Sequence, residues 1–144
     1  MKKQFLVLIA VFMLLFALNT YSLACDKGCT PGFWKQPQHT NQWNRYQPGE
    51  TLQEVFGCGS NIPLLEALST GGGGIYALQR HAVAALLNAA ELPCFDFTED
   101  QVKTDFCAAL NNGMLIESQK NAFEAENDGV CPLNRKHSNG GMPE

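Results

Sequence analysis

The side chains best suited to chemistry fall within one apolar stretch of the chain. Arg80, His81 and Asn88 are among the few polar residues in the run from Ile75 to Ala90. A charged or titratable group in an apolar helix must be paired or must face a cavity. His81 with Arg80 could therefore form a polar pocket in which the imidazole acts as acid, base or hydrogen-bond donor.

A second interpretation of these side chains is structural. Ion pairs that only tie a helix to its loops use the same residue types, and Arg80 could pair with Glu66 or Asp96. The glycines Gly71–Gly74 precede the helix, where free N–H groups favour an anion. No P-loop or dinucleotide pattern surrounds them. A tight connection between helices and a satisfied internal network are the plainer expectations.

The usual catalytic and metal-binding signatures are missing from the sequence. It has no His-Glu-x-x-His, no Gly-x-Ser-x-Gly and no Cys-x-x-Cys. Asn127–Gly129 resembles part of a calcium loop but lacks the other ligands. We interpret it as the C-cap of a helix. We therefore expect no metal and no cofactor, and the only catalytic candidates are His81 and Arg80.

A second candidate site is a segment with no sustained periodicity, from Cys25 to Pro48. It is rich in Pro, Gly, Gln and Asn, and it predicts an ordered loop. Its aromatic rings could form an exposed platform for sugar rings or a protein partner, or they could anchor the loop to the core. The rings are Phe33, Trp34, Trp43 and Tyr46, and the hydrogen-bonding side chains nearby are Lys35, Gln36, His39 and Asn41.

The first residues predict export. Lys2 and Lys3 precede an apolar run from Phe5 to Leu18, and the small residues Ser22 and Ala24 follow. This is the pattern of a signal peptide over residues 1–24. The apolar run is shorter than the ~20 residues that span a bilayer, which disfavours an uncleaved anchor.

A lipoprotein is a minor alternative to a freely secreted or periplasmic protein. Cleavage after Ala24 would leave Cys25 as the first residue, and a lipid could be attached there. The branched apolar residue that usually lies three positions earlier is replaced by Ser22. The expected location is therefore extracellular or periplasmic, without a membrane span in the mature chain.

Six cysteines follow this leader, and an even number in an exported chain indicates disulfides. They allow 15 pairings, and spacing alone does not choose among them. No histidine lies where a zinc site would need it. The cysteines are Cys25, Cys29, Cys58, Cys94, Cys107 and Cys131.

Charge and length narrow the class of partner. The chain has a formal net charge of −4, so a nucleic-acid partner, which needs a basic footprint, is not expected. The length suits a single domain over residues 25–133. The polar, glycine-rich tail from 134 to 144 is expected to be disordered.

Helix signals recur through the rest of the chain. Capping boxes start at Thr51 and Thr98, and the apolar run from Ile75 predicts a buried central helix. The expected fold is all-α, a compact disulfide-stapled bundle of four to five helices with an irregular aromatic-rich N-terminal arm. The predicted helices run from Thr51 to about Gly57, from Asn61 to the glycines, from Ile75 to Ala90, from Thr98 to about Asn112, and from Leu115 to about Glu126, with Leu115, Ala122 and Phe123 buried in the last.

Three motifs together resemble an uncharacterised family of secreted prokaryotic domains. They are Cys-Thr-Pro-Gly-Phe-Trp-Lys at Cys29–Lys35, the glycine run that leads into Ala77–Ala89, and Gly-Val-Cys-Pro-Leu-Asn at Gly129–Asn134. The resemblance implies a location and a fold but no activity. It also implies that Trp34 is buried.

The resemblance further implies one disulfide, between Cys29 and Cys131, because each lies in one of its terminal motifs. For the others we expect the local pair Cys94–Cys107, which leaves Cys25 with Cys58. After Lys35 the sequence departs from the family, which tends to have Asn-His there, so a ligand role for that pair is not carried over.

The resulting hypothesis is a secreted or cell-surface module that binds without catalysis. Its ligand would be a surface protein or a glycan, bound by the aromatic N-terminal loop. The alternative is an extracellular hydrolase that uses the pocket of His81 and Arg80. The predicted binding residues are Phe33, Lys35, His39, Trp43 and Tyr46.

Overall fold

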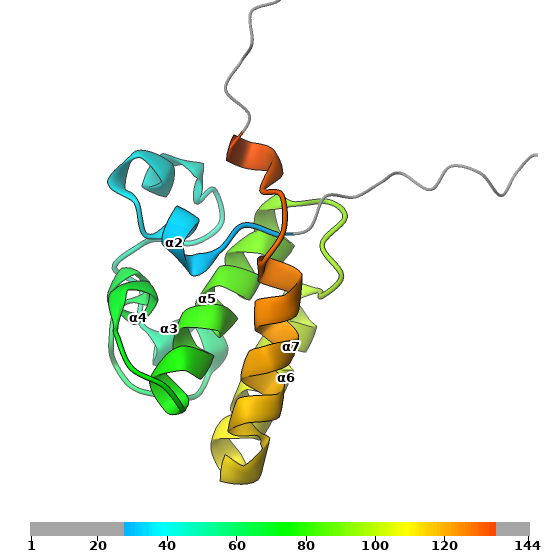
Figure 1. Cartoon of the computed structure of the whole chain (residues 1–144). Coiled ribbons are helices and arrows are strands. Elements are labelled where there is room, and N and C mark those ends of the chain that lie inside the picture. The colour runs from blue at the N-terminus through cyan, green and yellow to red at the C-terminus, as the bar shows by residue number, and fades with distance from the viewer. Residues whose placement is uncertain (1–27, 135–144) are drawn as a thin grey trace, which may run out of the picture.

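The computed structural model describes residues 28–134, and this part of the chain is built from helices (Figure 1). It contains no strand in that range, only an isolated bridge between Thr51 and Pro63. The predicted signal peptide, Cys25 and residues 135–144 of the tail lie outside the described residues. The elements are α2 (Pro31–Trp34), η1 (Pro37–Gln42), α3 (Leu52–Phe56), α4 (Leu64–Ser69), α5 (Ile75–Glu91), α6 (Glu99–Asn111), η2 (Gly113–Leu115), α7 (Ile116–Asn127) and η3 (Pro132–Asn134).

Helix α5 is the centre of the domain. The pair α6 and α7 packs on one side of it, and α2 and α4 pack on the other, as Figure 1 shows. Its residues 82–88 are all buried. Several of them are alanines, which let neighbouring helices approach closely. The predicted all-α bundle around this helix is confirmed.

Local capping explains where the shorter helices begin. The Thr51 and Thr98 hydroxyls accept from the N–H groups of Glu54 and Gln101, each at 3.2 Å, so both predicted capping boxes are confirmed. Helix α4 begins later than predicted, at Leu64. The Leu64 N–H donates to the carbonyl of Glu50 at 2.8 Å. The residues just before Leu64 therefore pair with the chain at the start of α3 instead of forming a helical turn.

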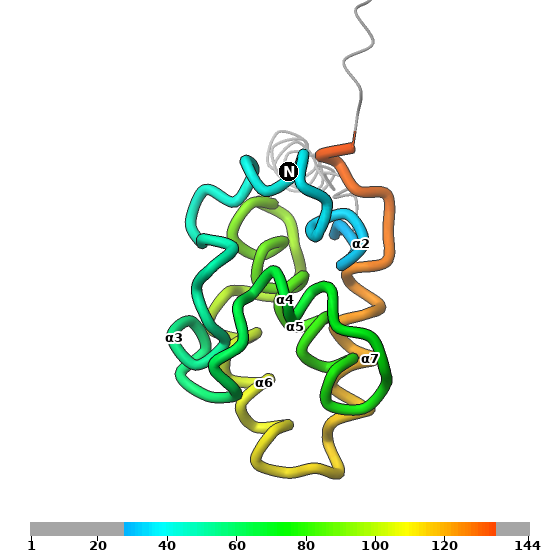
Figure 2. The backbone as a smooth tube through the Cα atoms, turned by 90° about the vertical axis from the view of Figure 1, so that its left-hand side faces the viewer, coloured from blue at the N-terminus to red at the C-terminus, as the bar shows by residue number. Residues whose placement is uncertain are grey.

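The last long helix differs from the prediction in what it buries. Phe123 is fully buried, but Leu115 is 41% exposed and Ala122 faces solvent. The prediction for Leu115 and Ala122 is wrong: Ala122 lies on the side of α7 that faces solvent, and Leu115 lies in the turn of the hairpin that α6 and α7 form. Figure 2 shows its turn at the end of the molecule, where no other element covers it.

The disulfides fix the two halves of the chain to each other. Cys29–Cys131 is confirmed. The second bond joins Cys58 to Cys107, so the expected pairs Cys94–Cys107 and Cys25–Cys58 are wrong. Phe56 packs on Phe106 with ring centroids 4.7 Å apart, which brings the end of α3 beside α6. Cys94 is also disulfide-bonded.

Candidate functional site

We call residues 28–46 the N-terminal segment. Its first helix, α2, is set by Thr30, whose hydroxyl accepts from the Phe33 N–H at 3.2 Å, and by Pro31 in the first turn. This single turn directs Phe33 and Trp34 into the core. The segment then crosses the domain through η1 and turns inward again at Trp43.

The aromatic rings of the N-terminal segment are buried. Trp34 is 0% exposed, Trp43 4%, Phe33 7% and Tyr46 8%. The expected burial of Trp34 is confirmed. The other three rings also anchor the segment to the core, so they do not form an exposed platform. Burying large rings gives a long loop the apolar contact that its polar sequence lacks.

Asn88 attaches the beginning of the segment to α5. It is fully buried and makes four hydrogen bonds. Its Oδ1 accepts from the N–H of Cys29 at 2.8 Å and from the indole of Trp34 at 2.9 Å. Its Nδ2 donates to the carbonyl of Cys29 at 2.9 Å and to Oδ1 of Asn127 at 2.7 Å. Asn88 is therefore a structural residue with all its hydrogen-bonding capacity used.

Two further contacts extend this buried network to α7. Asn127 donates to the carbonyl of His81 at 2.9 Å, and the N–H of Gly28 donates to the carbonyl of Glu126 at 2.8 Å. A Cβ at Gly28 would lie 2.3 Å from Nδ2 of Asn88. Only glycine allows the chain to pass this close to the asparagine.

Two carboxylates attach the other end of the segment. Glu91, at the end of α5, accepts from the backbone N–H of Asn44 at 2.8 Å and from its side chain at 2.6 Å. Glu99, at the start of α6, accepts from the Tyr46 hydroxyl and pairs with Arg45. Burial, the hydrogen bond to Glu99 and its charge together raise the pKa of Tyr46.

Between these two attachments the segment turns polar side chains outward. Lys35, Gln36, Gln38 and Asn41 are exposed, and His39 is partly exposed, with its ring stacked on Phe33 at 3.8 Å between centroids. We call the solvent-exposed side of residues 35–45 the outer face. A cavity of about 350 Å³ adjoins its end and is lined by Arg45, Tyr46, Thr98, Glu99, Asp100 and Lys103.

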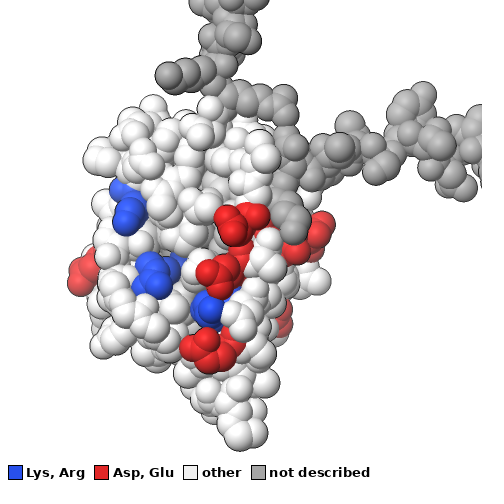
Figure 3. Space-filling model, in the orientation of Figure 1, with Lys and Arg blue, Asp and Glu red and all other residues white. Residues whose placement is uncertain are grey.

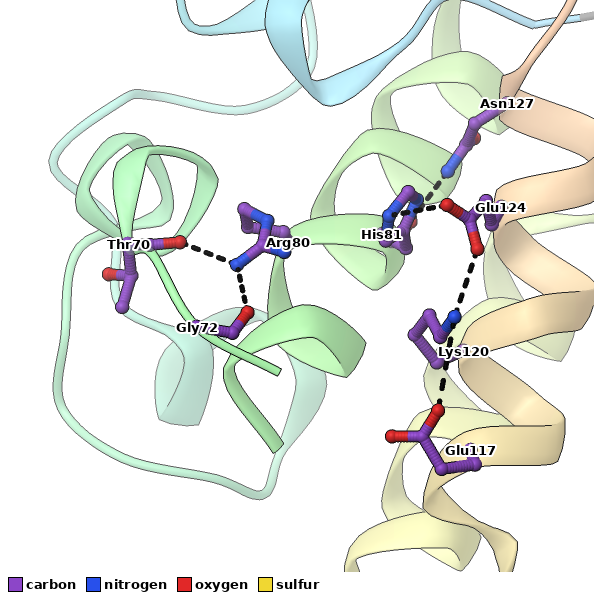
Figure 4. A network of polar contacts seen from close by, with 8 residues as sticks. All are labelled: Thr70, Gly72, Arg80, His81, Glu117, Lys120, Glu124 and Asn127. Atoms are coloured by element: carbon purple, nitrogen blue, oxygen red, sulfur yellow. Dashed lines mark hydrogen bonds and ion pairs between the residues drawn. The ribbon is translucent and has the colours of Figure 1, made fainter. Parts of the chain in front are cut away.

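The residues expected to form a catalytic pocket lie on different sides of α5 (Figure 4). Arg80 donates to the carbonyls of Thr70 at 2.6 Å and Gly72 at 3.0 Å. It therefore holds the glycine connection between α4 and α5. The expected pairing with Glu66 or Asp96 is not formed, because the loop turns its own carbonyls toward the guanidinium.

His81 points the other way, toward α7. Its side chain is 13% exposed, with Nε2 3.7 Å from Oε1 of Glu124 and Nδ1 buried without a hydrogen-bond partner. Desolvation lowers the pKa of His81, partly opposed by the charge of Glu124. Lys120 donates to Glu124 at 3.0 Å and lies 3.9 Å from Glu117. His81 thus lies in a helix contact and not in an open cleft.

Two features are absent from the described residues, 28–134. This part of the chain contains no group of three or more His, Cys, Asp or Glu placed to hold a metal ion. None of its helices has the length and apolar content needed to cross a bilayer.

The fold and the site define a small disulfide-bonded helical domain with a docked N-terminal segment. A family model matches residues 30–136, and the chain belongs to this family, the protodermal factor 1 C-terminal domain. It is a plant family, so the resemblance to secreted prokaryotic domains is wrong. No match was found among curated proteins or solved structures.

Proposed function

We propose that this domain is an exported, non-enzymatic binding module that contacts its ligand through the outer face, residues 35–45. One observation carries the proposal. The segment is attached at both ends by buried or partly buried side chains, and between those attachments its polar side chains are exposed. A loop held in one conformation loses little conformational entropy on binding, which favours affinity.

Export is supported by the cysteines and by the leader pattern. Cys29, Cys131, Cys58, Cys107 and Cys94 are all oxidised. Disulfides persist in oxidising compartments and are rare in the cytosol. We therefore place the domain outside the cytoplasm.

The surface chemistry favours a polar ligand that carries little charge. On the view in Figure 3 acidic groups gather over α7. The charged residues of the outer face are Lys35 and Arg45, and Arg45 is paired with Glu99. The outer face is rich in side-chain amides, which both donate and accept hydrogen bonds. A glycan or the polar surface of a protein would suit such a face, and a nucleic acid would not.

Substitutions on the outer face test the proposal. Asn41→Glu places a charge in its middle, and Asn121→Glu places the same charge on the exposed side of α7. The wild type and both variants, all with their disulfides intact, are applied to a glycan array and to intact cell surfaces. We expect Asn41→Glu to lose at least tenfold in binding and Asn121→Glu to bind as the wild type. Equal binding by all three proteins would overturn the proposal.

A further inference from the structure

We infer that the cavity between Arg45 and the start of α6 is a binding subsite for one residue of an uncharged sugar. This inference rests on the proposed function, because the cavity adjoins the outer face and would extend it. The cavity is open to solvent and has a mostly polar lining, and its volume of about 350 Å³ is near the lower end of the ~300–1,000 Å³ range of small-molecule pockets. That space suits a single sugar ring and not a folded partner.

The charges around the cavity balance. Arg45 and Lys103 contribute two positive charges, and Glu99 and Asp100 contribute two negative ones. Arg45 and Glu99 are paired directly. A charged ligand would be attracted by the two side chains of opposite charge and repelled by the two of like charge. An uncharged ligand with several hydroxyl groups avoids this conflict.

The groups that face solvent match a polyhydroxyl ligand. The side chain of Arg45 is 62% exposed beyond its contact with Glu99, so several guanidinium N–H donors are free. Asp100 and Thr98 are exposed at the rim. The ammonium of Lys103 lies 5.3 Å from the centroid of the Tyr46 ring. Neighbouring sugar hydroxyls could donate to Asp100 and accept from Arg45 and Lys103.

The base of the cavity is rigid. Glu99 is 17% exposed and holds both Tyr46 and Arg45. The capping box of Thr98 and Gln101 fixes the first turn of α6, which carries Asp100, and Lys103 lies at the start of the next turn. Side chains held in place before binding contribute more to affinity than mobile ones.

The test is an NMR titration of the oxidised, ¹⁵N-labelled domain. The probes are neutral oligosaccharides of xylose, glucose, galactose and mannose, with an oligomer of a uronic acid as the charged comparison. We expect a neutral sugar to shift the backbone amides of residues 98–103 and 45–46. Asp100→Ala and Lys103→Ala should each weaken that binding at least tenfold. Glu66→Ala, which removes an exposed carboxylate from α4, should leave it unchanged.

The outcomes separate this inference from the proposed function. Binding that survives Asp100→Ala and Lys103→Ala but is lost in Asn41→Glu would overturn the subsite and keep the outer face. Tighter binding of the uronic-acid oligomer than of every neutral sugar would also overturn it. Binding that survives all of these substitutions would overturn both. Circular dichroism melting of each variant confirms that it is folded.

Discussion

The helical body and the N-terminal segment are held by different kinds of interaction. In the body, α5 packs against α4, α6 and α7 through many apolar side chains, so that each contact is one among several. The segment is attached by the Cys29–Cys131 disulfide, by a few polar groups, chiefly Asn88 at one end and Glu99 at the other, and by its buried rings.

This difference predicts where the domain is sensitive to substitution. Truncation of one buried apolar side chain in the body costs about 2–5 kcal/mol but leaves no hydrogen-bonding group without a partner. Removal of Asn88 leaves several buried groups without partners, and an unpaired buried donor or acceptor costs about 1–3 kcal/mol. The segment should therefore respond to single substitutions more strongly than its short helices suggest.

Asn88→Ala should have the largest effect. It removes the acceptor for Cys29 and the Trp34 indole and the donor to Asn127. We expect a loss of about 4 kcal/mol or more in the free energy of unfolding, measured by denaturant titration with the disulfides intact. Asn121→Ala, at an exposed position, should stay within about 0.5 kcal/mol of the wild type. A similar small loss for both would show that the network is not needed.

Trp43→Ala should have the second largest effect on stability. The side chain is 4% exposed, and truncation of a buried tryptophan costs about 3–5 kcal/mol. Thermal melting measures the loss, with Asn41→Ala as the exposed neighbour for comparison. A melting temperature close to that of the wild type would contradict the burial and restore the ring to the surface.

Glu99→Gln should have a smaller effect, which is visible in two measurements. Loss of the charged partner of Arg45 and Tyr46 should cost about 1–2 kcal/mol of stability. Because the hydrogen bond and charge of Glu99 help to raise the pKa of Tyr46, the variant should also ionise its phenol at lower pH. Ultraviolet absorbance during an alkaline titration reports this, and an unchanged tyrosine titration would contradict the contact.

The pH dependence of stability should show the smallest effect. Burial lowers the pKa of His81 in the folded domain, so below the ordinary value of about 6.5 the unfolded chain binds the proton first. Stability should therefore fall as the pH drops below about 6.5 and level off below the folded pKa. His81→Gln should flatten this part of the profile. The lowered pKa of Glu124 affects stability only as the pH approaches and falls below its ordinary value of 4.5, which is a separate pH range.

The sequence predicts the helical body well because its signals are local. The capping boxes at Thr51 and Thr98 and the apolar run from Ile75 each specify a helix within a few residues of the chain. The Cys58–Cys107 bond could not be predicted in this way. It depends on Phe56 reaching Phe106 across the fold, and no local pattern encodes that contact.

The N-terminal segment is harder to predict because its contacts also join residues that are far apart in the sequence. Its rings recur with no helical or strand period, so the sequence alone does not decide between burial and exposure for Trp43 and Tyr46. The role of Asn88 cannot be predicted either, because its partners Cys29, Trp34 and Asn127 lie far away in the sequence. One signal was present. A buried polar residue in a mostly apolar helix must have hydrogen-bond partners.

Hydrogen exchange at the segment tests the central claim most directly. The Cys29 amide and the Trp34 indole donate to buried Asn88, so both should exchange only through global unfolding, as slowly as the amides in the middle of α5. In Asn88→Ala they should exchange much faster than those amides. Rapid exchange of both groups in the wild-type domain would contradict the account, because it would show a segment that lies on the body without being fixed to it.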